Sequence, residues 1–132
     1  EPEAHLHPLK QRMMADIISA LNNAGAYMQI TTHSDYLLRR INELINLQRI
    51  YLKYQDSTEF EKICKECKIP SCLKFDFSRL GAYLLNRNSD GSSNIVPQDV
   101  EDGIPFSSFT DALNVSLANG YRLNEYLENE DC

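Results

Sequence analysis

Two short runs of this chain carry side chains that can act together on a phosphate group. The first is Glu1-Pro2-Glu3-Ala4-His5-Leu6-His7-Pro8, and the second is Ile30-Thr31-Thr32-His33-Ser34. A carboxylate such as that of Glu1 can orient a water molecule and accept its proton, and an imidazole such as that of His33 can hydrogen-bond a phosphate oxygen. The pairing is typical of the second half of a site that hydrolyses a nucleotide.

The first half of such a site is not found in the sequence. Nothing in the 132 residues resembles G-x-x-x-x-G-K-[ST], the loop whose backbone N–H groups and lysine hold phosphates. The chain also opens inside the first run. We therefore expect a piece of a larger ATPase that is inactive by itself.

The composition predicts one globular domain that stays out of the membrane. The chain is 42% hydrophobic and 24% charged, and no apolar run approaches the ~18 residues that a membrane span needs. The net charge of -6 argues against a broad nucleic-acid footprint, because such surfaces gather Lys and Arg. The start does not read as a signal sequence, so we expect a cytoplasmic protein.

Three of the four cysteines lie close together in the sequence. Cys64, Cys67 and Cys72 are spaced C-x2-C-x4-C, and Cys132 is terminal. A structural zinc site needs four ligands, so this spacing supplies one too few unless a distant histidine completes it. Reduced thiols are the favoured interpretation, and a small zinc-binding domain is the alternative.

The elements that would position the two runs follow from hydrophobic periodicity. Residues 7–24 are predicted to form a helix with an apolar stripe, and residues 26–32 a short buried strand of a parallel sheet. Ser34 or Asp35 is expected to cap a second long helix from Tyr36 to about Tyr54. This helix, strand and helix order is the rhythm of an α/β layered domain.

The second half of the chain has a different character. We predict a short helix over residues 58–68 and a half-buried strand over 74–78. Residues 82–87 and 94–97 flank a turn centred on Asp90-Gly91, which predicts a hairpin. The last segment, from Ser107 or Ser108 to about Glu128, is expected to be helical with a break at Asn119-Gly120.

The two opening motifs resemble those of a known family. Glu1-Pro2-Glu3-Ala4-His5-Leu6-His7-Pro8, with Gln11 one turn later, resembles the end of the Walker B strand and the D-loop of ABC-type ATPases of the SMC/OLD-like AAA group. Thr31-Thr32-His33-Ser34 resembles their switch, or H-loop. The stretch from Asp102 to Asp111 is also similar to the C-terminal part of these proteins.

The resemblance implies a fold class and a domain organisation. The chain would be a single partial domain, residues 1–132, from the C-terminal portion of a P-loop NTPase of α/β class. Residues 1–55 would carry the Walker B end, the D-loop and the H-loop. Residues 56–132 would complete the ATPase head with a β-hairpin and a helix.

The resemblance also implies site residues and cofactors. The catalytic residues would be Glu1 and His33, with Thr32 and Ser34 as neighbours in the H-loop. The D-loop residues at the interface of an ATP-sandwiched dimer would be Glu3, His5, His7 and Gln11. ATP and Mg²⁺ are expected in the intact parent, with Mg²⁺ held by an aspartate that precedes the Walker B glutamate in the family.

Partners and alternatives remain open at this point. The resemblance implies a Walker A part, a homodimer or larger oligomer formed on ATP, and a DNA-processing, repair or phage-defence partner. The competing interpretation is a non-catalytic interaction module with an acidic surface. In that case Glu1 is a terminal glutamate and His33 is a capping or loop histidine. The pair His5 and His7 could also bind a metal, although Pro8 and the helix start explain His7 without one.

Overall fold

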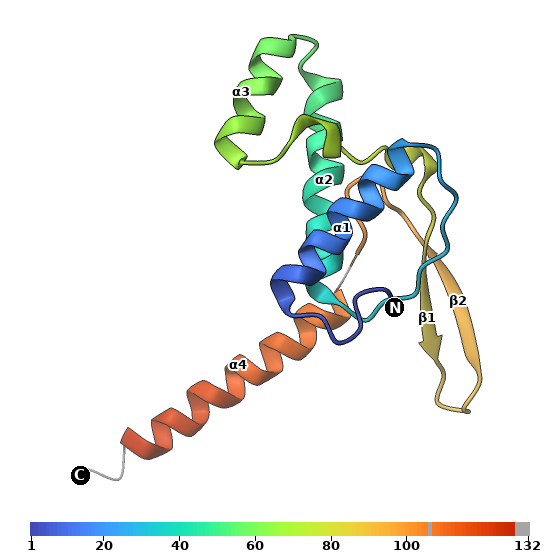
Figure 1. Ribbon diagram of the computed structural model, residues 1–132. Coiled ribbons are helices and arrows are strands. Elements are labelled where there is room, and N and C mark those ends of the chain that lie inside the picture. The colour runs from blue at the N-terminus through green and yellow to red at the C-terminus, as the bar shows by residue number, and fades with distance from the viewer. Residues whose placement is uncertain (106, 129–132) are drawn as a thin grey trace.

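The computed structural model describes residues 1–105 and 107–128 and is mainly helical (Figure 1). The helices are α1 (Pro8–Asn23), α2 (Asp35–Lys53), α3 (Ser57–Cys67) and α4 (Ser107–Glu128), with 3-10 turns η1 (Ser71–Leu73) and η2 (Phe77–Arg79). Among the described residues the only sheet is an antiparallel hairpin of β1 (Ala82–Arg87) and β2 (Ser93–Gln98). No helix in this part of the chain is long and apolar enough to cross a membrane.

The core forms where α1 packs against α2. The Ser34 side chain caps α2 by accepting a hydrogen bond from Leu37 N at 3.0 Å, and Pro8 occupies the first turn of α1, where its missing N–H is not needed. Both helices therefore begin where the sequence predicts them to begin. The buried side chains of this core are Ala15, Ile18, Leu37, Ile41, Leu44, Ile45 and Phe75.

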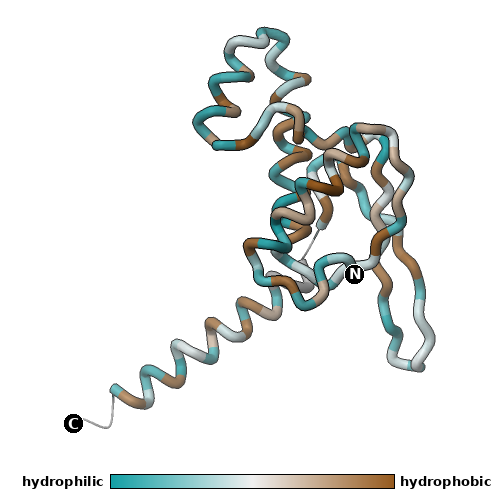
Figure 2. Tube along the Cα trace, in the orientation of Figure 1, coloured by the Kyte–Doolittle hydropathy of each residue, from teal (hydrophilic) through white to brown (hydrophobic). Residues whose placement is uncertain are grey.

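The apolar stripe that predicts α1 does not face this core. The side chains of Leu9, Met13, Ile17 and Leu21 are 67%, 52%, 52% and 45% exposed. The helix instead buries residues of another face, Ala15, Ile18, Ser19 and Asn22. Figure 2 shows hydrophobic residues recurring along α1. An apolar face of α1 is therefore left open.

The strand predicted over residues 26–32 is wrong for this chain. The segment is extended but forms no ladder with any described strand, and Tyr27 is 95% exposed. A strand exists only when a neighbour supplies hydrogen-bond partners, and the hairpin β1–β2 pairs only with itself. The α/β class of the parent remains a prediction, because the described residues show no parallel sheet.

The segment after α2 folds back along it. α3 buries Phe60 and Cys64 beside Leu47, and the Tyr51 and Phe60 rings meet edge to face at 5.2 Å. The predicted helix is confirmed, but the strand over 74–78 is wrong. The Asp76 carboxylate accepts hydrogen bonds from Ser78 N and Oγ and turns the chain into η2.

The segment before α4 is bound to α2 by side chains of that helix, Asn42 and Arg49, of which Arg49 forms an ion pair with Asp102 at 2.8 Å. Asn42 accepts a hydrogen bond from Ile104 N at 2.7 Å and donates one to Ile104 O at 2.9 Å. Gly103 has φ +103°, and a Cβ there would lie 3.0 Å from the Asn42 side chain, so glycine is required. The hairpin is confirmed, whereas the expected break at Asn119-Gly120 is wrong because α4 runs through it.

Candidate functional site

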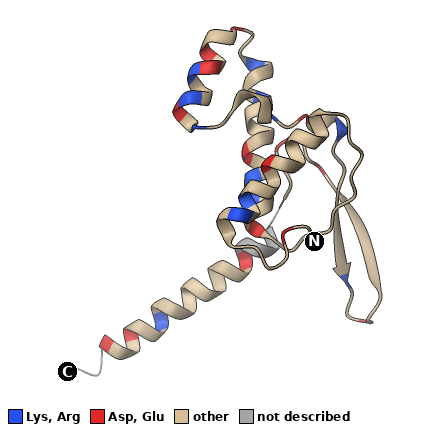
Figure 3. Ribbon diagram, in the orientation of Figure 1, with Lys and Arg blue, Asp and Glu red and all other residues tan. Residues whose placement is uncertain are grey.

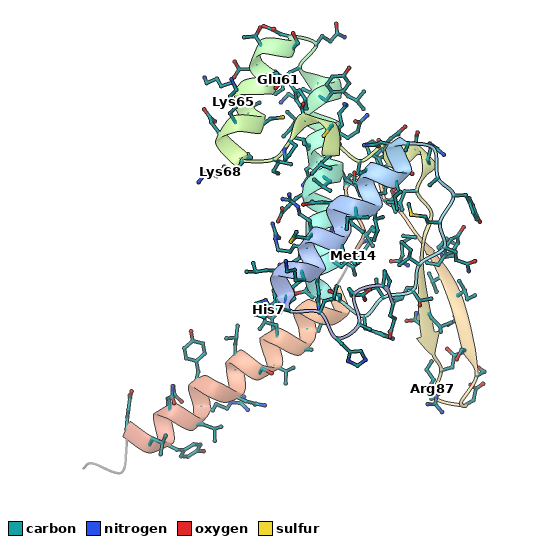
Figure 4. The ribbon with its side chains drawn as sticks, viewed as in Figure 1. His7, Met14, Glu61, Lys65, Lys68 and Arg87 are labelled. Carbon is teal, nitrogen blue, oxygen red and sulfur yellow. The ribbon has the colours of Figure 1, made fainter. Side chains whose placement is uncertain are left out.

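The opening segment is a tight turn that delivers the chain into α1. Ala4 N donates to Glu1 O at 3.2 Å and Leu6 N donates to Glu3 O at 3.0 Å. His5 has φ +66°, a left-handed conformation that non-glycine residues seldom adopt. His7 caps the helix, since its Nδ1 accepts a 3.4 Å hydrogen bond from Leu9 N, and it lies at the N-terminal end of α1 (Figure 4).

The switch segment is shaped by side chains bonding to its own backbone. Thr32 Oγ1 accepts from Ser34 N at 2.9 Å, and Ser34 in turn caps α2. Short hydroxyl side chains favour such turns ahead of helices. His33 lies between them with its side chain 91% exposed.

The two predicted catalytic side chains meet. Glu1 Oε1 lies 3.4 Å from His33 Nε2, and the Glu1 side chain is 46% exposed. The pair lies outside the core, open to a reactant from solvent. This contact joins the Glu-Pro-Glu motif to the Thr-Thr-His-Ser motif through the two side chains that are predicted to be catalytic.

A second contact beneath this pair is buried. Thr32 Oγ1 donates a short hydrogen bond to Glu3 Oε1, and Glu3 is only 4% exposed. The other oxygen, Glu3 Oε2, is buried with no hydrogen-bond partner among the described residues. Glu3 was predicted at a dimer interface, but in this structure its side chain binds within its own chain.

Gln11 completes the link between the two segments. Its Oε1 accepts a 2.5 Å hydrogen bond from Ser34 Oγ, and its Nε2 donates to Leu6 O at 2.9 Å. Gln11 on α1 therefore holds the opening turn and the start of α2 together. Together with Glu3 and Thr32, these side chains fix the distance between Glu1 and His33. We call Glu3, Gln11, Thr32 and Ser34 the polar clasp.

The remaining predicted residues stay at the surface. His5 and His7 are both exposed, and neither lies in a group that can hold a metal ion. Indeed, no cluster of three or more His, Cys, Asp or Glu suited to a metal occurs in the described part of the chain. The predicted interface role of His5 and His7 remains a prediction.

The cysteines lie in different environments. Cys64 is buried in the α3 cluster, whereas Cys67 and Cys72 are exposed, and all three are free thiols. Burial, followed by the nearby Glu61 and Cys67, raises the pKa of the Cys64 thiol. Cys132 lies outside the described residues. Reactive thiol chemistry therefore has its accessible positions at Cys67 and Cys72.

Sequence reasoning missed an ion-pair network that fixes α1 on α2. Arg12 forms a two-point contact with Glu43 at 2.9 and 2.8 Å, and Arg40 binds Asp16 at 2.7 Å and Glu43 at 2.8 Å. Burial opposes the charge on Glu43, but the hydrogen bonds from Arg12 and Arg40 outweigh it and lower the Glu43 pKa. The feature of the sequence that could have indicated a charged face on α1 is the spacing of Arg12 and Asp16, which lie one helical turn apart.

A groove begins beside Glu1 and runs along the open face of α1. Its walls are Met14, Ile17, Ile18 and Leu21 on α1 and residues 28–31 of the extended segment, with Glu1 and Pro2 at one end. Met14 of α1 is labelled in Figure 4. The volume is about 700 Å³ and no Lys or Arg lines it. Such a surface suits apolar side chains and not phosphates.

Comparison with protein-family models, curated proteins and solved structures finds no match for this chain.

Proposed function

We propose that this chain is the C-terminal part of an ATP-hydrolysing head of the ABC type, close to the SMC/OLD-like AAA group. The observation that carries the proposal is the 3.4 Å approach of the Glu1 carboxylate to the His33 imidazole. The two residues come from separate motifs, and the polar clasp holds those motifs together. The parent would be cytoplasmic.

The side chains described above suggest how the intact protein would hydrolyse ATP. Hydrolysis of ATP depends on positioning and charge stabilisation, with a carboxylate to orient the attacking water and accept its proton. Glu1 would take that role, and His33 would hydrogen-bond the γ-phosphate and sense its presence. Mg²⁺, held by the aspartate that the resemblance places before Glu1 in the parent, would neutralise phosphate oxygens.

The exposed apolar face of α1 is a further observation in favour of the proposal, because another part of the parent protein would cover it. The exposed stripe Leu9, Met13, Ile17 and Leu21 lies next to the groove and to the unpaired extended segment 26–32. In α/β domains the helices pack their apolar faces on a sheet, so an uncovered apolar helix face fits a sheet supplied by another part of the parent. The Walker A part would provide that sheet, and ATP would close two such heads into a dimer that drives a DNA-processing, repair or phage-defence partner.

The proposal is tested by comparing two forms of the protein. ATP binding and hydrolysis are measured for this chain and for the parent form that includes about one more domain on its N-terminal side. Activity confined to the longer form is expected, because the phosphate-binding loop is absent here. Binding by the short chain would mean that it holds a nucleotide pocket of its own. If neither form bound or hydrolysed ATP, the ATPase proposal would be rejected and the interpretation as an interaction module would be favoured.

A further inference from the structure

Helix α4 is an arm that leaves the body of the molecule. It spans 22 residues, and in Figure 1 it extends away from α1 and α2 and lies along no other described element. Five of its large apolar side chains are between 50% and 71% exposed: Leu113, Leu117, Tyr121, Leu123 and Leu127. Most of the stability of a helix in a protein comes from packing an apolar face.

Most of the charged side chains of α4 lie opposite these five apolar residues. At 3.6 residues per turn, the five fall within an arc of about 180° that also contains Ser116, Gly120, Asn124 and, toward one edge, Glu128. Asp111, Arg122 and Glu125 fall on the opposite face. Figure 3 shows the helix largely without charge except for these few positions and its C-terminal end. A partner on the apolar arc would bury no charged side chain at its centre.

The order of residue sizes along this arc reads the same in both directions. The seam positions 113, 116, 120 and 123 are spaced by three, four and three residues, which is heptad spacing, and carry Leu, Ser, Gly and Leu. A two-fold axis at residue 118 pairs 113 with 123 and 116 with 120. Large residues then meet large ones, and Ser116 meets Gly120.

We propose that α4 binds α4 of a second copy of this chain as an antiparallel helix pair. A two-fold interface must be complementary to itself, and the mirrored seam satisfies this condition. The small central pair lets the two helices approach closely. An interface confined to one helix from each copy is small compared with most specific interfaces, so the dimer is weak. The ATPase proposal is not needed for this inference.

Oligomeric state tests the proposal directly. The mass of the chain is measured by light scattering over a concentration series of roughly 5 to 200 µM, where a weak dimer responds to mass action. Leu113→Asp/Leu123→Asp should weaken association by ~100-fold or more, because each dimer would bury four carboxylates. The control Val115→Asp/Ala118→Asp introduces the same number of carboxylates on the outer face of the helix, away from the seam, and should dimerise like the wild type.

A cross-linking experiment tests the orientation of the pair. Leu113→Cys mixed with Leu123→Cys should form a disulfide-linked dimer between the two variants, whereas Leu113→Cys alone should not link through position 113, as peptide mapping would show. A wild-type chain that is monomeric throughout would overturn the proposal. So would a dimer that survives Leu113→Asp/Leu123→Asp, or a link between two copies of position 113.

Discussion

The buried contact between Thr32 and Glu3 makes a quantitative prediction about stability. Thr32→Val keeps the shape of the side chain but removes the hydroxyl group. Two hydrogen bonds are lost: the one that Thr32 donates to Glu3, and the one that it accepts from Ser34 N at 2.9 Å. Since a bond to a charged group contributes about 1.5–3 kcal/mol and a neutral one about 0.5–1.5, the expected loss is about 2–4 kcal/mol.

Urea denaturation at neutral pH measures this loss, and the adjacent Thr31 provides a matched control. Thr31 is exposed and no hydrogen bond of its side chain is found in the described structure, so Thr31→Val should change the free energy of unfolding by less than about 0.5 kcal/mol. A double-mutant cycle with Glu3→Gln isolates the pairwise contribution. Equal effects of the two Thr→Val variants would show that the Glu3–Thr32 contact does not hold the two motifs together.

Three further predictions concern the body of the protein. Glu43→Gln should lower the free energy of unfolding by about 1 kcal/mol at pH 7. Because the pKa of Glu43 in the folded protein lies below its ordinary value of 4.5, the stabilisation is present above pH 4.5 and is lost as the pH falls through the folded pKa. Denaturation at pH 3 should therefore show a smaller difference between the variant and the wild type. Gly103→Ala should cost about 1–3 kcal/mol through its positive φ and its approach to Asn42, and should increase amide exchange over residues 100–104. Iodoacetamide should modify Cys67 and Cys72 in the native protein and spare buried Cys64, as peptide mass mapping would show.

Local signals in the sequence predict much of the secondary structure. The cap at Ser34, Pro8 at the first turn of α1 and Gly25 after its end fix helix boundaries through bonds within a few residues. Asp90-Gly91 does the same for the hairpin. These elements depend on nearby residues, so the sequence is sufficient for them.

The failures are positions where the outcome depends on what lies beside the segment. Residues 26–32 have the composition of a buried strand, but no described strand pairs with them. The stripe on α1 predicts the helix correctly, yet the face that packs on α2 is the one carrying Ala15 and Ser19. Periodicity reveals an apolar face without revealing which part of the protein covers it.

The candidate site shows the same division. The Glu-Pro-Glu and Thr-Thr-His-Ser motifs predict that Glu1 and His33 act together, and the structure places them 3.4 Å apart. The polar clasp could not be read from the sequence, because its contacts join residues 23 and 29 positions apart. The burial of Glu3 could not be predicted from the sequence either, because it depends on how α1 and α2 pack.

The most direct test of the central claim is ATP turnover by the N-terminally extended protein carrying Glu1→Gln, with nucleotide binding measured on the same sample. The amide keeps the size of the side chain but cannot accept the proton of the attacking water, so binding should persist while hydrolysis slows by ~10²-fold or more. His33→Ala should also impair turnover. Unchanged turnover in Glu1→Gln, with the longer protein active, would contradict the role assigned to Glu1.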